Sequence, residues 1–126
     1  MNKEMFKWST KEQLRYIRGF VDGEGTVIFG WSHTTKNGKK YKQRNRAVRI
    51  SNTNKEILLT IKKMLENLEI QSHLYMDTKA GIRKSTMDSW LLVILGKENF
   101  RKFQRLVGFT EKWKKIRLQE IIASYR

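Results

Sequence analysis

The amino-acid sequence predicts an α+β fold in which helices and antiparallel hairpins alternate in the order αββαββαα. In four segments, apolar residues recur at steps of three and four, which is typical of amphipathic helices. Between these segments, four runs alternate apolar and polar residues, which is typical of strands with one buried face. Because the helix-plus-hairpin unit comes twice, an antiparallel sheet backed by helices is the most economical packing.

Turn and capping signals set the boundaries of these elements. Thr10 can cap the first helix, and the Asn-Gly pair at 37–38 favours a tight hairpin turn. Thr53 followed by Glu56 is typical of a capping box that opens the second helix. Gly108 separates the last two helices. The expected elements are helix 10–22, strands 26–34 and 41–52, helix 53–68, strands 70–77 and 87–95, and helices 97–107 and 110–124.

The large aromatic residues fall at core-facing steps of these elements. The last helix is expected to be anchored by four apolar residues, which are Trp113, Ile116, Ile121 and Ile122. Stacking on nucleic-acid bases would need exposed rings. We therefore interpret five rings as packing residues: Phe29, Trp31, Phe100, Phe103 and Trp113.

Composition indicates one domain over residues 1–126 with an acidic partner. The chain is 39% hydrophobic, contains no proline and shows no linker. A net charge of +15 repels itself in the folded state, so a polyanion is the natural partner and nucleic acid is the first candidate. A ribosomal-type protein or a solvated basic surface explains the charge equally well.

Several classes of protein are excluded or disfavoured. The absence of cysteine excludes disulfides, thiol catalysis and thiolate zinc sites, and two histidines are too few for a zinc centre. No apolar run approaches the ~20 residues of a membrane span, and the first residues lack the apolar core of a secretory signal. We expect a soluble intracellular protein, in the cytoplasm or an organelle, with no membrane partner and no small-molecule substrate.

Acidic residues stand where the first helix is expected to end, although a helix C-terminus disfavours negative charge. Asp22 could accept backbone hydrogen bonds around the turn. Glu24 could balance the charge of the basic strands, or it could hold Mg²⁺, a hard cation that takes few protein oxygens.

Residues 17–25, Ile-Arg-Gly-Phe-Val-Asp-Gly-Glu-Gly, resemble the signature of the LAGLIDADG homing endonucleases. The helix–hairpin order resembles that family over essentially the whole chain, which implies a saddle-shaped antiparallel sheet backed by helices. Relative to the signature, Arg18 stands in place of a small apolar residue and Gly23 in place of alanine. Glu24 stands in place of aspartate, so the carboxylate is kept but its side chain is one methylene longer. The signature matches at Gly19, Asp22, Glu24 and Gly25, with Phe20 and Val21 as conservative variants.

This resemblance implies a site-specific endonuclease that hydrolyses phosphodiesters of double-stranded DNA with Mg²⁺, as family members encoded in mobile introns do. Mn²⁺ or another divalent cation can substitute. Glu24 and the backbone carbonyl of Gly23 would bind the metal, and Asn52 would position water. A basic residue near the start of the last helix would counter developing charge, for which Lys112 is our choice and Lys114 the alternative. An ordinary phosphate contact explains either lysine equally well.

A single signature also implies a homodimer, because relatives with two signatures are about twice as long. Small residues four apart let two helices approach closely, so the seam would consist of Tyr16, Gly19, Phe20 and Gly23. Tight packing inside one chain is the alternative explanation of the glycines. A two-fold dimer predicts a long, near-palindromic target.

DNA contacts are expected on the sheet face opposite the core and on the hairpin ends. The positions expected to read base edges are Thr26, Ile28, Ser32, Thr34, Gln43, Asn45, Arg49, His73, Tyr75 and Asp77. Those expected to bind phosphates are Lys36, Lys39, Lys40, Lys42, Lys79, Arg83 and Lys84. For His73, an ordinary surface position is an equally good explanation.

Two other interpretations stay open. A catalytically silent relative, such as an RNA-splicing maturase or a regulator, would keep the fold and bind nucleic acid without cutting it. A ribosomal-type basic protein would be a monomer, and the acidic junction would then be a coincidence.

Overall fold

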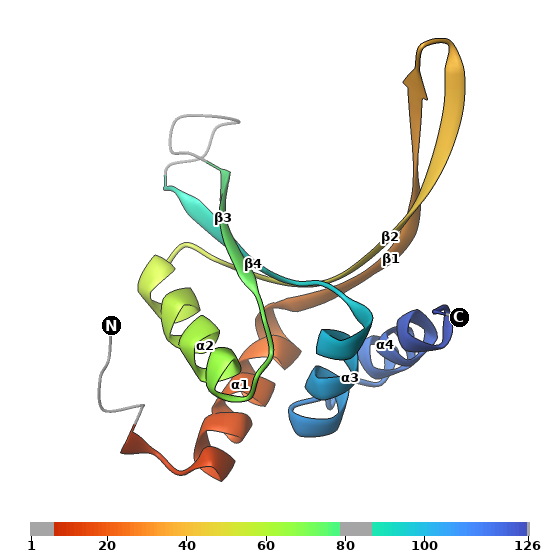
Figure 1. The fold of residues 1–126 in the computed structure, drawn as a ribbon. Coiled ribbons are helices and arrows are strands. Elements are labelled where there is room, and N and C mark those ends of the chain that lie inside the picture. Colours follow the sequence, from red (N-terminus) through yellow and green to blue (C-terminus); the bar gives the residue numbers. More distant parts are fainter. Residues whose placement is uncertain (1–6, 79–86, 126) are drawn as a thin grey trace.

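The computed structural model describes residues 7–78 and 87–125 and confirms the predicted element order. Within these residues the four strands form one antiparallel sheet in the order β1-β2-β4-β3. The helices lie on one side of the curved sheet, and the β1–β2 hairpin projects well beyond them (Figure 1). The elements are α1 (Thr10–Glu24), β1 (Gly25–Lys36), β2 (Lys39–Asn52), α2 (Lys55–Asn67), β3 (His73–Thr78), β4 (Ser89–Ile94), α3 (Lys97–Leu106) and α4 (Lys112–Ala123).

The long hairpin turns through two residues, as the Asn-Gly signal predicts. Asn37 and Gly38 both have positive φ angles, 53° and 76°, which is the geometry of a tight turn that matches the twist of the flanking strands. Lys36 pairs directly with Lys39. Both strands therefore run to the tip of the hairpin and are longer than predicted.

The two helix caps differ from the prediction by one residue each. Ser9, not Thr10, caps α1: its hydroxyl accepts from the Glu12 backbone N–H (3.2 Å), while the Glu12 carboxylate accepts from the Ser9 N–H (3.3 Å). Asn54, not Thr53, caps α2, because its side-chain oxygen accepts from the Ile57 N–H (3.3 Å). In both cases a stronger capping neighbour displaces the predicted residue.

The core lies between the helices and one face of the sheet. Alternate residues of β1, β2 and β4 point into it, and α1 contributes Ile17 and Val21. No helix in the described part of the chain is long and apolar enough to cross a membrane. The other fully covered core side chains include Val27, Val48, Ile50, Leu58, Ile61, Met64, Leu65, Leu92, Ile94, Phe100, Phe103 and Ile121.

Of the five rings predicted to pack in the core, Trp31 does not. Phe29 is half-buried, but Trp31 is 52% exposed because β1 continues past the helices, so its core-side positions lose their cover. Cations cover the rings there instead. The Arg44 guanidinium lies 3.6 Å from the centre of the Phe29 ring and 4.7 Å from that of Trp31, and the Lys42 ammonium lies 4.7 Å from Trp31.

The predicted core stripe of α4 is also partly wrong. Trp113 and Ile116 are 47% and 43% exposed, whereas Lys114 and Leu118 are buried together with the correctly predicted Ile121. Apolar residues occur on several sides of this helix, so periodicity alone selects the wrong stripe. What fixes its orientation is the burial of Lys114 against the end of α1.

Candidate functional site

Helix α1 passes directly into strand β1, and Gly25 makes this junction possible. A Cβ atom at Gly25 would lie 2.5 Å from the Val21 carbonyl oxygen and 3.1 Å from its Cα, both rigid backbone atoms. Gly25 then pairs with Ile50 in the sheet. A side chain at this position would push the strand away from the helix, so the glycine fixes where the preceding residue, Glu24, lies.

Asp22 connects the end of α1 to the segment that precedes α4. Its carboxylate accepts from the backbone N–H groups of Thr110 (2.8 Å) and Glu111 (3.3 Å). It does accept backbone hydrogen bonds, as the sequence suggested, but from a segment 88 residues away and not from its own turn. Burial raises the pKa of Asp22, but hydrogen bonds from Thr110 and Glu111 and the charge of Lys114 outweigh it and hold this pKa below its usual value.

Lys114 binds the same helix end from the other side. Its side chain is almost fully covered, and its ammonium donates to the backbone oxygens of Asp22 (2.7 Å) and Val21 (3.3 Å) and lies 3.3 Å from the Glu111 carboxylate. Three oxygens thus face its three donors. A cation at a helix C-terminus is favourable because the last carbonyls carry partial negative charge. Lys112, in contrast, is exposed at the first turn of α4.

Glu24 and Asn52 come together although they lie far apart in the chain. Both line a shallow hollow of about 320 Å³ at the ends of α1 and β2. Glu24 is exposed, while the Asn52 side-chain oxygen accepts from the Asn54 N–H (2.7 Å). Three hydroxyl residues that the sequence analysis did not select, Ser51, Thr53 and Ser89, complete the lining.

The oxygen-rich lining suits a hard cation, but one chain offers few ligands. Within residues 7–78 and 87–125 there is no group of three or more acidic, histidine or cysteine side chains that could hold a metal ion. Mg²⁺ is commonly bound by one or two carboxylates together with substrate phosphates and water. The exposed Glu24 carboxylate therefore fits as one ligand of an ion that takes its other ligands from outside this chain.

The predicted dimer seam is open in the single chain. Among the described residues, a Cβ added at Gly19 or Gly23 would meet no atom within 4 Å beyond the adjoining part of its own helix, so these glycines do not serve close packing within that part of the chain. Beside them, the Tyr16 and Phe20 rings are half-buried and lie 6.2 Å apart. The strip formed by Tyr16, Gly19, Phe20 and Gly23 carries no charge.

Strand register places the predicted base-reading residues of the long hairpin on the open sheet face. Val27 pairs with Val48 on the core side, so the residues alternating with them face away from the helices. This places Thr26, Ile28, Ser32, Thr34, Lys36, Lys39, Gln43, Asn45 and Arg49 together. Lys40 and Lys42 lie on the other face by the same alternation.

In the second hairpin, His73 pairs with Val93 and Tyr75 with Leu91, which places both on the open face. The register then shifts between Met76 and Thr78, so Asp77 lies in a bulge where strict alternation does not apply. Lys79, Arg83 and Lys84 lie outside the described residues.

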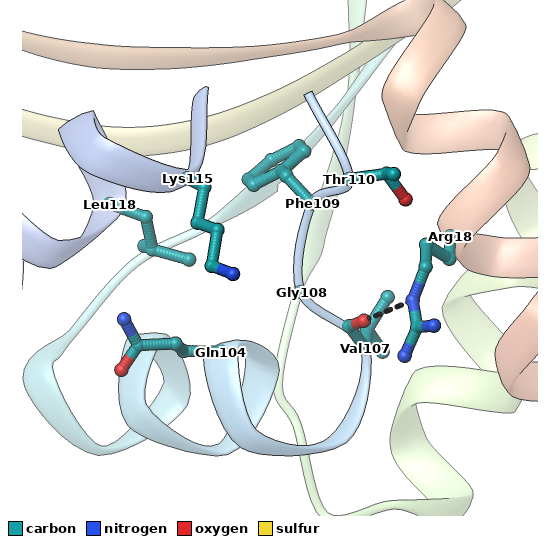
Figure 2. Close-up of a pocket in the computed structure, with 8 residues that line it drawn as sticks. All are labelled: Arg18, Gln104, Val107, Gly108, Phe109, Thr110, Lys115 and Leu118. Carbon is teal, nitrogen blue, oxygen red and sulfur yellow. Dashed lines mark hydrogen bonds between the residues drawn. The ribbon is translucent and has the colours of Figure 1, made fainter. Parts of the chain in front are cut away.

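Arg18 also joins α1 to the α3–α4 connection. Its Nε donates to the Val107 carbonyl (2.7 Å), as Figure 2 shows, at the edge of a pocket of about 360 Å³. Gln104 and Lys115 line the same pocket from α3 and α4 (Figure 2). The arginine that departs from the small apolar residue of the signature thus supplies a third polar contact between α1 and this connection.

The carboxylate of Asp22 is expected to make stability depend on pH. Because its folded-state pKa is lowered, its contribution is fully present above its unfolded pKa of about 4 and is lost as the pH falls through the folded value. Asp22→Asn should cost about 1–2 kcal/mol near pH 7. In urea titrations, the gap between the wild type and this variant should narrow below pH 4. A gap that stays constant from pH 7 to pH 3 contradicts the assignment.

Lys114→Met is expected to destabilise the fold by about 1–3 kcal/mol, because it leaves carbonyls at the end of α1 without their donor. Lys112→Met is the matched control on the same helix and should leave the urea midpoint unchanged, since Lys112 is exposed. An equal loss in both variants would contradict the structural role of Lys114.

Comparisons with known proteins agree with this geometry. A family model described as LAGLIDADG-like domain matches residues 11–108. An uncharacterized protein of Methanocaldococcus jannaschii is 28% identical over 130 aligned positions, which cover 97% of this chain and 42% of that protein. The chain therefore spans about two fifths of the length of this relative.

Solved structures show the same fold. The homing endonuclease I-DmoI, as a glycine-to-serine variant in complex with its target DNA, has a TM-score of 0.55 at 23% identity, over 80% of this chain and 44% of that one. Mesophilic variants of I-DmoI have a TM-score of 0.58 at 21% sequence identity, over 89% of this chain and 49% of that one. The archaeal intron-encoded homing endonuclease I-Vdi141I, complexed with DNA, has a TM-score of 0.52 at 19% sequence identity, over 78% of this chain and 55% of that one. With a family model matched over most of its length, this chain belongs to the LAGLIDADG family.

Proposed function

We propose that two copies of this chain form a metal-dependent, site-specific endonuclease for double-stranded DNA. The observation that carries this proposal is the position of Glu24, an exposed carboxylate that Gly25 fixes at the end of α1, next to the open glycine strip. Catalysis needs a carboxylate that is held in place yet remains free to bind a metal.

Glu24 and the backbone carbonyl of Gly23 would hold Mg²⁺, or Mn²⁺ or another divalent cation in its place. When bound, the ion lowers the pKa of attacking water and neutralises charge on the leaving oxygen. Asn52 shares the hollow with Glu24 and, by its amide, would orient that water. Lys112, exposed on the first turn of α4, would contact the phosphate backbone or counter developing charge. Lys114 is the less suitable candidate, because its ammonium is already matched by three oxygens.

The homodimer is proposed because two strands have to be cut and each chain would supply one metal-binding carboxylate. One chain supplies one Glu24, whereas cutting both strands of a duplex requires a site at each. The match covers 44% and 49% of the two I-DmoI chains, so each of those chains is about twice as long as its matched part. A second copy of this domain, packed through the uncharged strip of Tyr16, Gly19, Phe20 and Gly23, would supply the second carboxylate.

The open face of the sheet would receive the DNA. Amide and guanidinium groups of Gln43, Asn45 and Arg49 lie on one face by register, and such groups pair with base edges in the major groove. Lys36 and Lys39, which pair with each other at the hairpin tip, would bind phosphates. Two-fold symmetry of the dimer predicts that the two half-sites are near-palindromic.

Glu24→Gln should remove Mg²⁺-dependent cutting while binding is retained. The change keeps the size of the side chain but weakens its hold on the metal, so we expect cleavage to slow about a hundred-fold or more. A target is first obtained by selecting cleaved sites from a randomised duplex library. Glu120→Gln, an exposed carboxylate on α4, is the matched control. If a parallel selection for binding recovers a duplex but the cleavage selection recovers none, the protein is a silent binder of the maturase or regulator type.

Gly19→Leu should separate the dimer without unfolding the chain. The new side chain enters open space in the single chain, so the helical content measured by circular dichroism should be retained, but in the dimer it would hold the two helices apart. Light scattering at micromolar concentration should show a dimer for the wild type and a monomer for the variant. Lys11→Leu, the same side chain at another exposed position of α1, should remain dimeric. A monomeric wild type would contradict the proposal.

A further inference from the structure

Strand β4 is apolar on both of its faces, although the described helices cover only one of them (Figure 1). Leu92 and Ile94 point into the core, and the residues that alternate with them, Leu91 and Val93, face the open side. A continuous apolar run is typical of strands that are buried on both faces. The open face of β4 therefore has the composition of a surface that a partner covers.

Neighbouring strands extend this surface into an apolar strip across the sheet, which consists of Ile28, Ala47, Tyr75, Leu91 and Val93. Cross-strand pairing joins Ile28 to Ala47 and Tyr75 to Leu91. Together with Leu95 these side chains line a hollow of about 370 Å³ in the open face. Ala47 and Val93, 6% and 7% exposed, are already covered by neighbouring side chains, whereas Ile28 and Leu91 are half-buried and Tyr75 is 52% exposed, so these three form the accessible part of the strip.

Polar and cationic side chains border the apolar strip. Gln43, Asn45 and Arg49 line the same hollow, and the chain carries a net charge of +15. A second copy of this chain would bring like charge to this face, unlike the uncharged strip on α1. A polyanion that also presents an apolar group would suit both the cationic border and the apolar strip. In the major groove of duplex DNA, the thymine C5-methyl is that apolar group.

We propose that the apolar strip recognises thymine in each half-site through its C5-methyl group. This inference rests on the proposed DNA-binding function and adds a base preference to it. It also gives a physical reason for preferring DNA over RNA. Uracil lacks the methyl group, and the major groove of duplex RNA is too deep and narrow for side chains to read.

The test replaces thymine by uracil, which removes only the methyl group. The probe is the duplex recovered by the cleavage selection, synthesised with deoxyuridine at one thymidine position at a time. For the wild type, binding should weaken about three- to five-fold at one or more positions in each half-site, as expected for the burial of one methyl group. A selected duplex that is bound equally well with uracil at every position would overturn the inference and leave the endonuclease standing.

Variants then assign the effect to the strip. Leu91→Ala should abolish the preference for thymine over uracil, and Tyr75→Ala, which truncates a half-exposed ring, should reduce it. Lys39→Ala, at the hairpin tip, should weaken binding to both duplexes equally and preserve their ratio. An undiminished preference in both strip variants would overturn the assignment. Failure to select any duplex would overturn the proposed function together with this inference.

Discussion

The exchange of hydrogen bonds between the end of α1 and the start of α4 is the interaction on which the rest of the structure depends. The Asp22 carboxylate binds N–H groups that precede α4, and the Lys114 ammonium binds carbonyls that end α1. Each chain segment thus satisfies backbone groups that the other leaves unpaired. Since the contact joins segments that are distant in the sequence, it holds both ends of the fold together.

The positions of the candidate catalytic groups follow from this attachment. With α1 held by α4, and with Gly25 leaving no room for a side chain, Glu24 has one place at the edge of the sheet. Pairing of Asn52 with Trp90 then brings Asn52 and the adjoining residue Ser89 beside it. On the other side of α1, the glycine strip remains uncovered because the bonds toward α3 and α4 come from residues such as Arg18 and Asp22, which lie on a different face of the helix.

The sequence was sufficient for the element order, the hairpin turn and most of the core, because these depend on local periodicity and turn chemistry. It was insufficient where distant segments decide. The exposure of Trp31 depends on where the helices stop covering β1, and the burial of Lys114 depends on carbonyls of α1. Glu24 was selected because it lies at an acidic junction of a helix and a strand, whereas Asn52 was selected only through the family resemblance, by its place at the end of the second strand. Ser89 carries no local signal, since only strand pairing brings it to the hollow.

The long β1–β2 hairpin reaches past the helices, so its outer half shares little with the core (Figure 1). On the face opposite the open one, the Arg44 guanidinium stacks on the Phe29 and Trp31 rings and supports the hairpin. Substitutions on the open face of this outer half are therefore expected to change neither core packing nor the attachment of α1. Under the proposed function, such a division would let an evolving lineage acquire new target sequences at little risk to folding, because recognition would reside in a part of the chain that shares few contacts with the core.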